Sequence, residues 1–146
     1  MPNHCSNQVV LSYPSEESAR AIKKQLEGKD GVFDFNTLVP EPPEVLETIH
    51  DPVTSEQLRS KYGADNWYDW RMANWGTKWN AYHSELDDSQ IKVGILDYRF
   101  DTAWAPPGGV CRALLDSIEG NNLGIQVNWF YDEPMNGLRG QLEEEV

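Results

Sequence analysis

The stretch CSNQVVLSYPSEESARAIKKQLEG, residues 5–28, decides the fold of this chain. Over 5–13 a mostly apolar set of side chains alternates with a polar set, which is the period of a strand with one buried face. A proline ends this run, Ser15 is a residue type that caps helices, and a glycine follows the next apolar stripe. The stretch therefore predicts a strand over 5–13 and an amphipathic helix over about 15–27.

The second half of the chain repeats this pattern. Alternating side chains predict strands over 77–85 and 91–100, joined as a hairpin by the polar turn 86–89. An apolar stripe predicts a helix over 108–119, and alternation returns over 123–131. The order β-α-β-β-α-β is that of the ferredoxin-like, split βαβ arrangement. We expect an α+β fold, with a four-stranded antiparallel sheet and both helices on one face.

An insertion and a tail complete a single domain of 146 residues. Residues 31–76 are rich in proline and acidic residues and predict an ordered insertion, with an extended piece over 32–35 and two short helices. Thr54 has capping-box spacing for the first helix, and Asp65 is the predicted cap of the second. The tail, 136–146, ends in three glutamates, and we expect it to be partly mobile.

The charge balance restricts the partners. Twelve basic and 24 acidic residues give a net charge of −12, which disfavours direct binding to nucleic acid or to an anionic membrane. We find no apolar run long enough to span a membrane and no signal-peptide pattern, and we expect a cytoplasmic protein. Cys5 and Cys111 lack the spacing of a metal site. We expect free thiols, no metal and no cofactor.

Four of the six tryptophans lie between residues 67 and 79, on a predicted helix that is apolar almost all round. One interpretation is an aromatic core that fixes the insertion to the sheet, which predicts that at least three of Trp67, Trp70, Trp75 and Trp79 are buried. The alternative is a pocket for a small molecule or nucleotide. That pocket would be formed by Trp67, Asp69, Trp70, Arg71, Asn74 and Lys78.

Four segments carry a family resemblance. They are Met1–Asn7, Phe33–Asn36 followed by Val39-Pro40, Trp67–Asn80, and Phe100–Pro107. In these segments the chain resembles the YubB ferredoxin-like family, small proteins of phages and conjugative plasmids that are mostly uncharacterised. The resemblance implies a ferredoxin-like fold and an origin in a mobile element. It implies no activity, cofactor or catalytic residue.

No catalytic motif stands out. The titratable candidates are His4, His83, Asp69, Asp97 and Asp101. We expect His83 to be a packed histidine, and Asp97 and Asp101 to share one face of a strand. A phosphate-binding loop, a metal-ligand cluster and a nucleophile elbow are all missing from the sequence, so we do not expect an enzyme. RNA binding is a further alternative, but the predicted third strand does not match the aromatic RNA-binding pattern.

The favoured hypothesis is a phage or plasmid accessory protein that acts without catalysis. It would bind and inhibit a host defence protein or nucleoprotein complex, in the manner of an anti-CRISPR or anti-restriction protein, through an acidic surface. The expected contributors to that surface are Glu41, Glu44, Glu47, Asp51, Glu56, Asp87 and Asp88.

Overall fold

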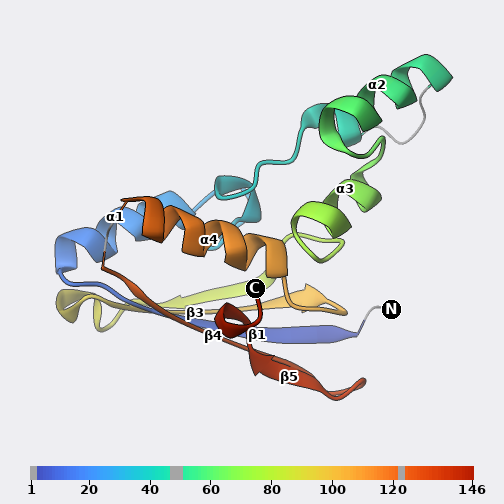
Figure 1. Cartoon of the computed structure of the whole chain (residues 1–146). Helices are drawn as coiled ribbons and strands as arrows, with labels where there is room; N and C mark the ends of the chain where they lie inside the picture. The colour runs from blue at the N-terminus through green and yellow to red at the C-terminus, as the bar shows by residue number, and fades with distance from the viewer. Residues whose placement is uncertain (1–2, 47–50, 122–123) are drawn as a thin grey trace.

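In the described part of the chain, five antiparallel strands form one sheet in the order β2-β3-β1-β4-β5 (Figure 1). The structure, a computed structural model, describes residues 3–46, 51–121 and 124–146. The strands are β1 His4–Ser12, β2 Tyr82–Asp87, β3 Ile95–Ala103, β4 Gln126–Glu133 and β5 Leu138–Gln141. The α+β class and the antiparallel sheet are therefore confirmed, with one strand more than the sequence predicted.

Helices α1 (Glu16–Leu26) and α4 (Gly108–Asn121) both lie over one face of the sheet (Figure 1). Ser15 caps α1 as predicted, and its side chain accepts a hydrogen bond from the Ser18 N–H at 3.1 Å. Helices α2 (Pro52–Tyr62) and α3 (Trp67–Asn74) belong to the insertion and project away from the sheet. Each helix in the described ranges is too short or too polar to cross a membrane.

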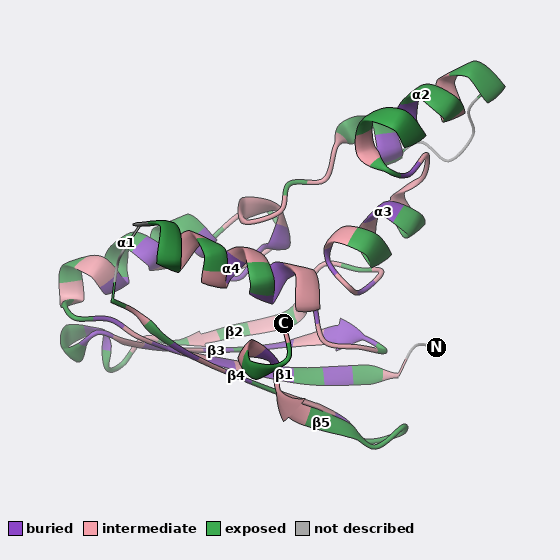
Figure 2. Cartoon of the chain, viewed as in Figure 1, coloured by how far each residue is buried: buried purple, intermediate pink, exposed green. Residues whose placement is uncertain are grey.

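The core lies between the sheet and the α1–α4 layer (Figure 2). Every second residue of β1, from Cys5 to Leu11, points into it, as the alternation predicted. At its centre the Phe33 ring packs against Phe100 with a centroid separation of 4.8 Å and against Trp129 at 5.7 Å. Both cysteines are buried free thiols, which confirms the sequence prediction.

The fifth strand comes from the segment that we expected to be mobile. The Glu133 carboxylate is fully buried and accepts hydrogen bonds from the N–H groups of Met135 and Asn136, at 3.1 and 2.8 Å. Gly137 follows with a φ of +68°, so the chain turns back and β5 pairs with β4. The sequence did not predict this strand because the turn before it was not recognised.

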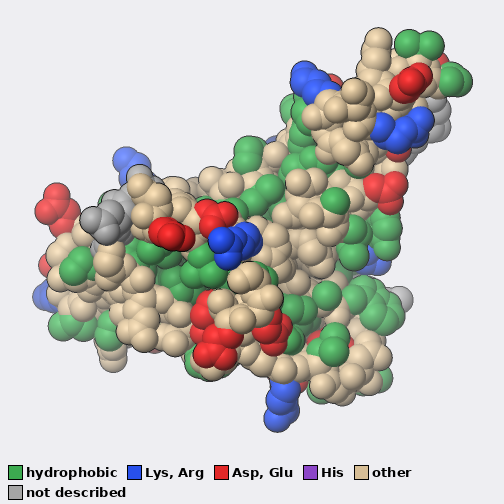
Figure 3. All heavy atoms as spheres, viewed as in Figure 1, with side chains coloured by type: hydrophobic (Ala, Val, Ile, Leu, Met, Phe, Trp, Pro, Cys, Tyr) green, Lys and Arg blue, Asp and Glu red, His purple; other side chains and the backbone are tan. Residues whose placement is uncertain are grey.

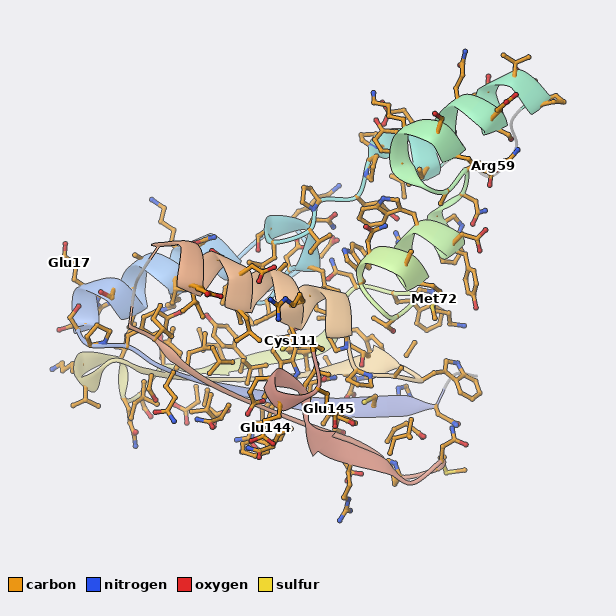
Figure 4. The ribbon with its side chains drawn as sticks, in the orientation of Figure 1. Glu17, Arg59, Met72, Cys111, Glu144 and Glu145 are labelled. Carbon is orange, nitrogen blue, oxygen red and sulfur yellow. The ribbon has the colours of Figure 1, made fainter. Side chains whose placement is uncertain are left out.

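The end of the chain packs beside α4 on the helical side. Residues Leu142–Glu144 form the short 3-10 helix η4, and Leu142 is buried. The Trp129 N–H donates to a Glu143 carboxylate oxygen at 2.8 Å. Acidic side chains gather here in Figure 3, and Figure 4 labels Glu144 and Glu145 at this place.

The hairpin strands begin later than predicted. Residues 77–81 are not a strand because their polar groups are used elsewhere: the Thr77 hydroxyl donates to the Ala103 carbonyl at 2.8 Å, and the Asn80 side chain binds the insertion. Residues 91–93 form the 3-10 helix η3, so β3 begins at Ile95. The β2–β3 register also shifts between Tyr82 and Glu85.

Two further boundaries differ. The predicted extended piece 32–35 leads instead into the 3-10 helix η1 (Phe35–Thr37), because the Asp34 side chain accepts the Asn36 N–H and caps it. The predicted strand 123–131 is β4, which starts at Gln126, and Leu123 lies outside the described residues.

The insertion helices are capped by the neighbours of the predicted residues. Asp51 rather than Thr54 caps α2, and Asn66 rather than Asp65 caps α3. Helix α3 is not buried all round: of its residues only Trp70 is buried, since α3 belongs to the part of the insertion that projects away from the sheet (Figure 2). Trp75, which follows α3, is also buried. Trp67 is half-buried and Trp79 is 38% exposed, so fewer of the four tryptophans are buried than predicted.

Candidate functional site

No helix of the described residues covers the face of the sheet opposite α1 and α4, and we call it the open face (Figure 1). The β1 residues that alternate with the buried set, including Ser6 and Gln8, lie on it. In the strand register Gln8 stands directly between Arg99 of β3 and Phe130 of β4. Residues paired in this way share a face, so the register alone assigns these side chains to the open face.

A depression of about 400 Å³ lies on the open face. It crosses four strands, β2, β3, β1 and β4, and we call it the sheet-face depression. Its floor and walls include Ser6, Gln8, His83, Glu85, Arg99, Asp101, Phe130 and Asp132. None of these residues was among the predicted binding residues, because the depression depends on which strands are neighbours.

Carboxylates outnumber guanidinium groups on the open face. The strand register places Glu85, Asp87, Asp97, Asp101 and Asp132 there, with Arg99 and Arg139. The ion pairs among them are long: Arg99 lies 3.8 Å from Asp97, and Arg139 lies 3.6 Å from Asp132. Ion pairs as long as these contribute little stability, so the two arginines hold Asp97 and Asp132 only weakly.

Two aspartates stand directly opposite each other near one end of the open face. Asp87 of β2 pairs with Asp97 of β3 in the register, an arrangement that is normally destabilising. Nearby donors offset it. Hydrogen bonds from Ser89 hold the pKa of the Asp87 carboxyl below its usual value, and the Gln8 amide donates to both Asp97 oxygens at 3.2 and 3.3 Å.

His83 lies at the rim of the sheet-face depression and is exposed, so the prediction of a packed histidine was wrong. Its φ of +53° is in the left-handed region, which is uncommon for residues other than glycine. This backbone turns the ring outward, and His83 Nδ1 lies 2.8 Å from Asp101 Oδ2. Nearby, His4 Nδ1 lies 2.6 Å from the Tyr82 hydroxyl, and burial followed by the Asp101 charge raises the Tyr82 pKa.

The other catalytic candidates do not join into one site. Asp97 and Asp101 share the open face, as predicted. Asp69 lies on α3, where it accepts a hydrogen bond from the Asn66 side chain. Within the ranges that the structure describes, no three histidine, cysteine or carboxylate side chains are placed to hold a metal ion.

The predicted acidic surface does not exist as one surface. Asp87 and Asp88 lie at the β2–β3 connection, where Lys23 of α1 contacts Asp88 at 2.6 Å and lowers its pKa. Asp51 caps α2, Glu56 belongs to α2, and Glu44 lies on η2 (Pro43–Leu46). The labels of Glu17 on α1 and Arg59 on α2 in Figure 4 mark these opposite ends of the molecule. Glu47 lies outside the described residues.

Glu41, another predicted docking residue, is used inside the insertion. Its side chain is 5% exposed and binds Arg71 through two contacts, Nε–Oε2 at 2.6 Å and Nη2–Oε1 at 2.8 Å. The Arg71 guanidinium also lies over the rings of Trp67 and Trp75, at 5.0 and 5.1 Å from their centroids. Glu41 and Arg71 therefore join the segment before α2 to α3, and neither is free to bind a partner.

The predicted aromatic pocket is not formed by the predicted residues. Trp70 is buried, and the Asn74 side chain donates to the Trp70 carbonyl at 2.9 Å. A small hollow does lie on the other side of α3, lined by Tyr68, Met72, Lys78, Ala103, Trp104 and Ala105. Only Lys78 of the six predicted residues is part of it, and Figure 4 labels Met72 on the side of α3 that faces this hollow.

Comparison with known proteins gives information on the fold alone. Neither a family model nor a curated protein matches this chain. The crystal structure of a protein api92 from Yersinia pseudotuberculosis, described with the family model DUF1281, is similar with a TM-score of 0.51 and 10% sequence identity. The match covers 97% of this chain and 93% of that chain. At this identity the likeness concerns chain topology.

Proposed function

We propose that the chain is a non-catalytic binding protein that docks onto a basic surface of a protein partner through the open face of its sheet. One observation carries the proposal: on the open face, which no helix of the described ranges covers, lie the carboxylates of Glu85, Asp87, Asp97, Asp101 and Asp132. This location replaces the acidic surface predicted from the sequence.

The overall charge supports a basic partner. A net charge of −12 attracts a positively charged surface from a distance and raises the rate of encounter. The uncovered carboxylates should make this attraction strongest at the open face. Because Glu85 and Asp87 are exposed and Asp97, Asp101 and Asp132 are partly exposed, their effect should weaken as salt increases.

The composition of the open face favours a protein over RNA. Sheets of this kind that bind RNA place stacking aromatics on their central strands, with basic neighbours. Here the central strands β1 and β3 present Ser6, Gln8, Asp97, Arg99 and Asp101. The exposed ring of Phe130 lies on β4, beside carboxylates.

A surface that normally binds nucleic acid is the basic partner that suits such a face. An acidic protein that covers it competes with the nucleic acid, so binding alone inhibits. The resemblance to proteins of phages and plasmids favours a host defence complex as the target. This is the proposed role of an anti-CRISPR or anti-restriction type of inhibitor, acting in the cytoplasm of a bacterial host.

The test compares two triple variants with equal net charge. One carries Asp97→Lys, Asp101→Lys and Asp132→Lys on the open face. The matched control carries Glu44→Lys, Glu56→Lys and Glu119→Lys, which lie on η2, α2 and α4. Each reversal adds two positive charges, so both variants change from −12 to −6. A partner is captured from host lysate, purified, and its affinity for the three proteins is measured at low and high salt.

We expect the open-face variant to lose at least tenfold in affinity and the control to lose much less. Affinity of the unmodified chain should fall with salt, because exposed charges are screened. Circular dichroism and melting midpoints establish that both variants fold. Equal losses in the two variants, or a larger loss in the control, would refute docking through the open face.

A second candidate function is sequestration of a small molecule or nucleotide in the sheet-face depression. The observation that favours it is the volume of about 400 Å³ together with Arg99, Gln8 and Phe130 among the lining residues. Mass spectrometry of the purified protein under native and denaturing conditions tests it. A stoichiometric ligand that is released on denaturation would favour this function over docking.

The finer description of the fold is also a proposal. Strands β2-β3-β1-β4, with α1 after β1 and α4 after β3, follow the ferredoxin-like order, to which β5 adds an edge. We infer a ferredoxin-like unit and membership of the YubB ferredoxin-like family. An experimental structure with a different connection between these strands would contradict it.

A further inference from the structure

Two aspartates flank Ser6 on the open face. In the register Ser6 stands directly opposite Asp101 on one side and Asp132 on the other. Neighbouring strands are about 4.8 Å apart, so the two aspartates face each other across roughly 10 Å. The serine between them is small, which leaves the sheet-face depression open at this point.

An exposed aromatic ring adjoins this gap. Phe130 precedes Asp132 by two positions on β4, so both side chains point to the open face. Phe130 is 42% exposed although it is a large apolar residue, and it lines the same depression. A ring next to carboxylates attracts a cation both through its π-face and through the neighbouring charges.

The charged groups that line the depression determine whether it attracts a positively or a negatively charged ligand. Three carboxylates, those of Glu85, Asp101 and Asp132, line it together with one guanidinium, that of Arg99. Arg99 is also attracted by Asp97, because Arg99 Nε lies 3.8 Å from Asp97 Oδ1. Asp97 itself does not line the depression. A cationic group is therefore attracted more strongly than an anionic one.

Resting on the proposed function, we propose that the sheet-face depression binds an arginine side chain of the basic partner between Asp101 and Asp132, against the ring of Phe130. A guanidinium is planar, donates hydrogen bonds in several directions and stacks on aromatic rings, whereas the ammonium group of lysine is a compact, strongly hydrated charge. The depression therefore distinguishes arginine from lysine, which the net charge of the chain cannot do.

His83 contacts Asp101, one of the two carboxylates of this site. Its ring lines the depression, and its Nδ1 lies 2.8 Å from Asp101 Oδ2, so the histidine competes with a guanidinium for this carboxylate. The groups that face His83 are Asp101 from β3, Tyr82 and the His4 ring, whose centroid lies 6.2 Å away.

The direct test is a titration of the isotope-labelled full chain with N-acetyl-arginine amide, with N-acetyl-lysine amide as the matched probe. We expect backbone amide shifts centred on Ser6, Phe130 and Asp132. The affinity for the arginine probe should be about fivefold higher than for the lysine probe, the size of one cation–π contact at an exposed site.

Single variants measure the contributions of the Phe130 ring and of the carboxylates to binding separately. Phe130→Leu should bring the two affinities together, and Phe130→Tyr, which retains a ring, should preserve the preference. Asp132→Asn should weaken both probes about threefold or more. Asp116→Asn on α4 removes one carboxylate from the helical side and should leave both affinities unchanged.

Failure of this inference can be distinguished from failure of the proposed function. Equal affinities for the two amides, or shifts centred elsewhere, overturn the arginine site. If the open-face triple variant still loses its captured partner in that case, docking through the open face stands and only the arginine site is wrong. If that triple variant also keeps its partner, both proposals are wrong.

Discussion

The Asn80 side chain binds the Asp34 carboxylate across 46 positions of sequence, with Nδ2 donating to Oδ1 at 2.8 Å. The same amide accepts hydrogen bonds through its oxygen from the N–H groups of Phe35 and Ala81, each at 2.9 Å. One end of the insertion is therefore joined to the other at its base. This places Phe33 and Phe35 in the core at a fixed position relative to β2.

Asp34→Asn should destabilise the fold. Burial raises the pKa of this carboxyl, but hydrogen bonds from Asn80, Asn36 and Asp30 outweigh burial and lower the pKa overall. Hydrogen bonds to a charged group contribute roughly 1.5–3 kcal/mol, and we expect a loss of unfolding free energy in that range at pH 7. Urea denaturation of the variant and the unmodified chain measures it.

The pH dependence of that loss has a definite sign. The folded pKa of Asp34 lies below the unfolded value of about 3.9, so its stabilisation is present above pH 4 and is lost as pH falls further. The difference between Asp34→Asn and the unmodified chain should therefore shrink below pH 4. Glu119→Gln, an exposed acid on α4, is the control. A constant difference over this range would contradict the assignment.

Gly28 provides an independent test of the same contact. A Cβ at this position would lie 2.2 Å from Asp34 Oδ2, so alanine cannot be accommodated unless the carboxylate moves. We expect Gly28→Ala to destabilise the chain, whereas Gly120→Ala, with open space around it on α4, should be neutral or stabilising. Melting midpoints of the two variants decide this, and equal midpoints would exclude the close approach.

Arg71→Met should destabilise the insertion. It removes the partner of Glu41, whose side chain is 5% exposed, and an unpaired buried carboxylate costs on the order of 3 kcal/mol. The matched control is Arg59→Met, because Arg59 pairs with Asp65 on the surface, where little change is expected. Chemical denaturation of both variants gives the comparison. A small effect at Arg71 would mean that Glu41 finds water or another donor.

Two tryptophans of the same segment should differ in their response to truncation. Trp75 is fully buried, packs on Phe35 and Trp70, and donates from its indole N–H to the Val39 carbonyl at 2.9 Å. Trp75→Ala should cost roughly 3–5 kcal/mol. Trp79 is 38% exposed, and we expect Trp79→Ala to cost about 1 kcal/mol or less. Similar losses at both positions would contradict the packing described for Trp75.

The buried thiols should make the protein less stable in alkali. Burial raises the pKa of Cys5 to about 11 and that of Cys111 to about 12. An unfolded thiol titrates near about 8.5, so the stabilisation is complete below that pH and is lost as pH rises toward 11. By pH 10 the loss should be on the order of 2 kcal/mol per thiol.

The double variant Cys5→Ala, Cys111→Ala isolates this effect from other alkaline titrations. Its unfolding free energy should fall less than that of the unmodified chain between pH 8 and pH 10. A thiol reagent at pH 8 should also react slowly with the native protein and rapidly with both cysteines in denaturant. Rapid reaction of the native protein would show that the thiols are accessible.

Local patterns predicted those elements whose signals lie within a few residues. The alternation of β1 and the cap at Ser15 depend on neighbours in sequence, and both are found in the structure. The turn before β5 was missed because its decisive group, the Glu133 carboxylate, looks like an ordinary surface acid in the sequence. A proline and glycine within four residues, Pro134 to Gly137, were the available signal.

The binding residues were harder to predict than the fold. Asp101, Ser6 and Asp132 come from three strands that are far apart in sequence, and only the strand register makes them neighbours. The predicted residue Glu41 was misassigned because the sequence shows its negative charge but does not show that it pairs with Arg71. The sequence shows that a side chain is negatively charged. Whether that charge can bind a partner depends on the contacts that the side chain makes in three dimensions.

The shifted pairing of β2 with β3 affects how these molecules behave at high concentration. An outer strand with a regular row of free N–H and C=O groups is a template on which other chains can aggregate. On β2 the register breaks between Tyr82 and Glu85, His83 adopts a left-handed backbone, and the strand ends in acidic Asp87. This border of the sheet is therefore a poor template for strand addition.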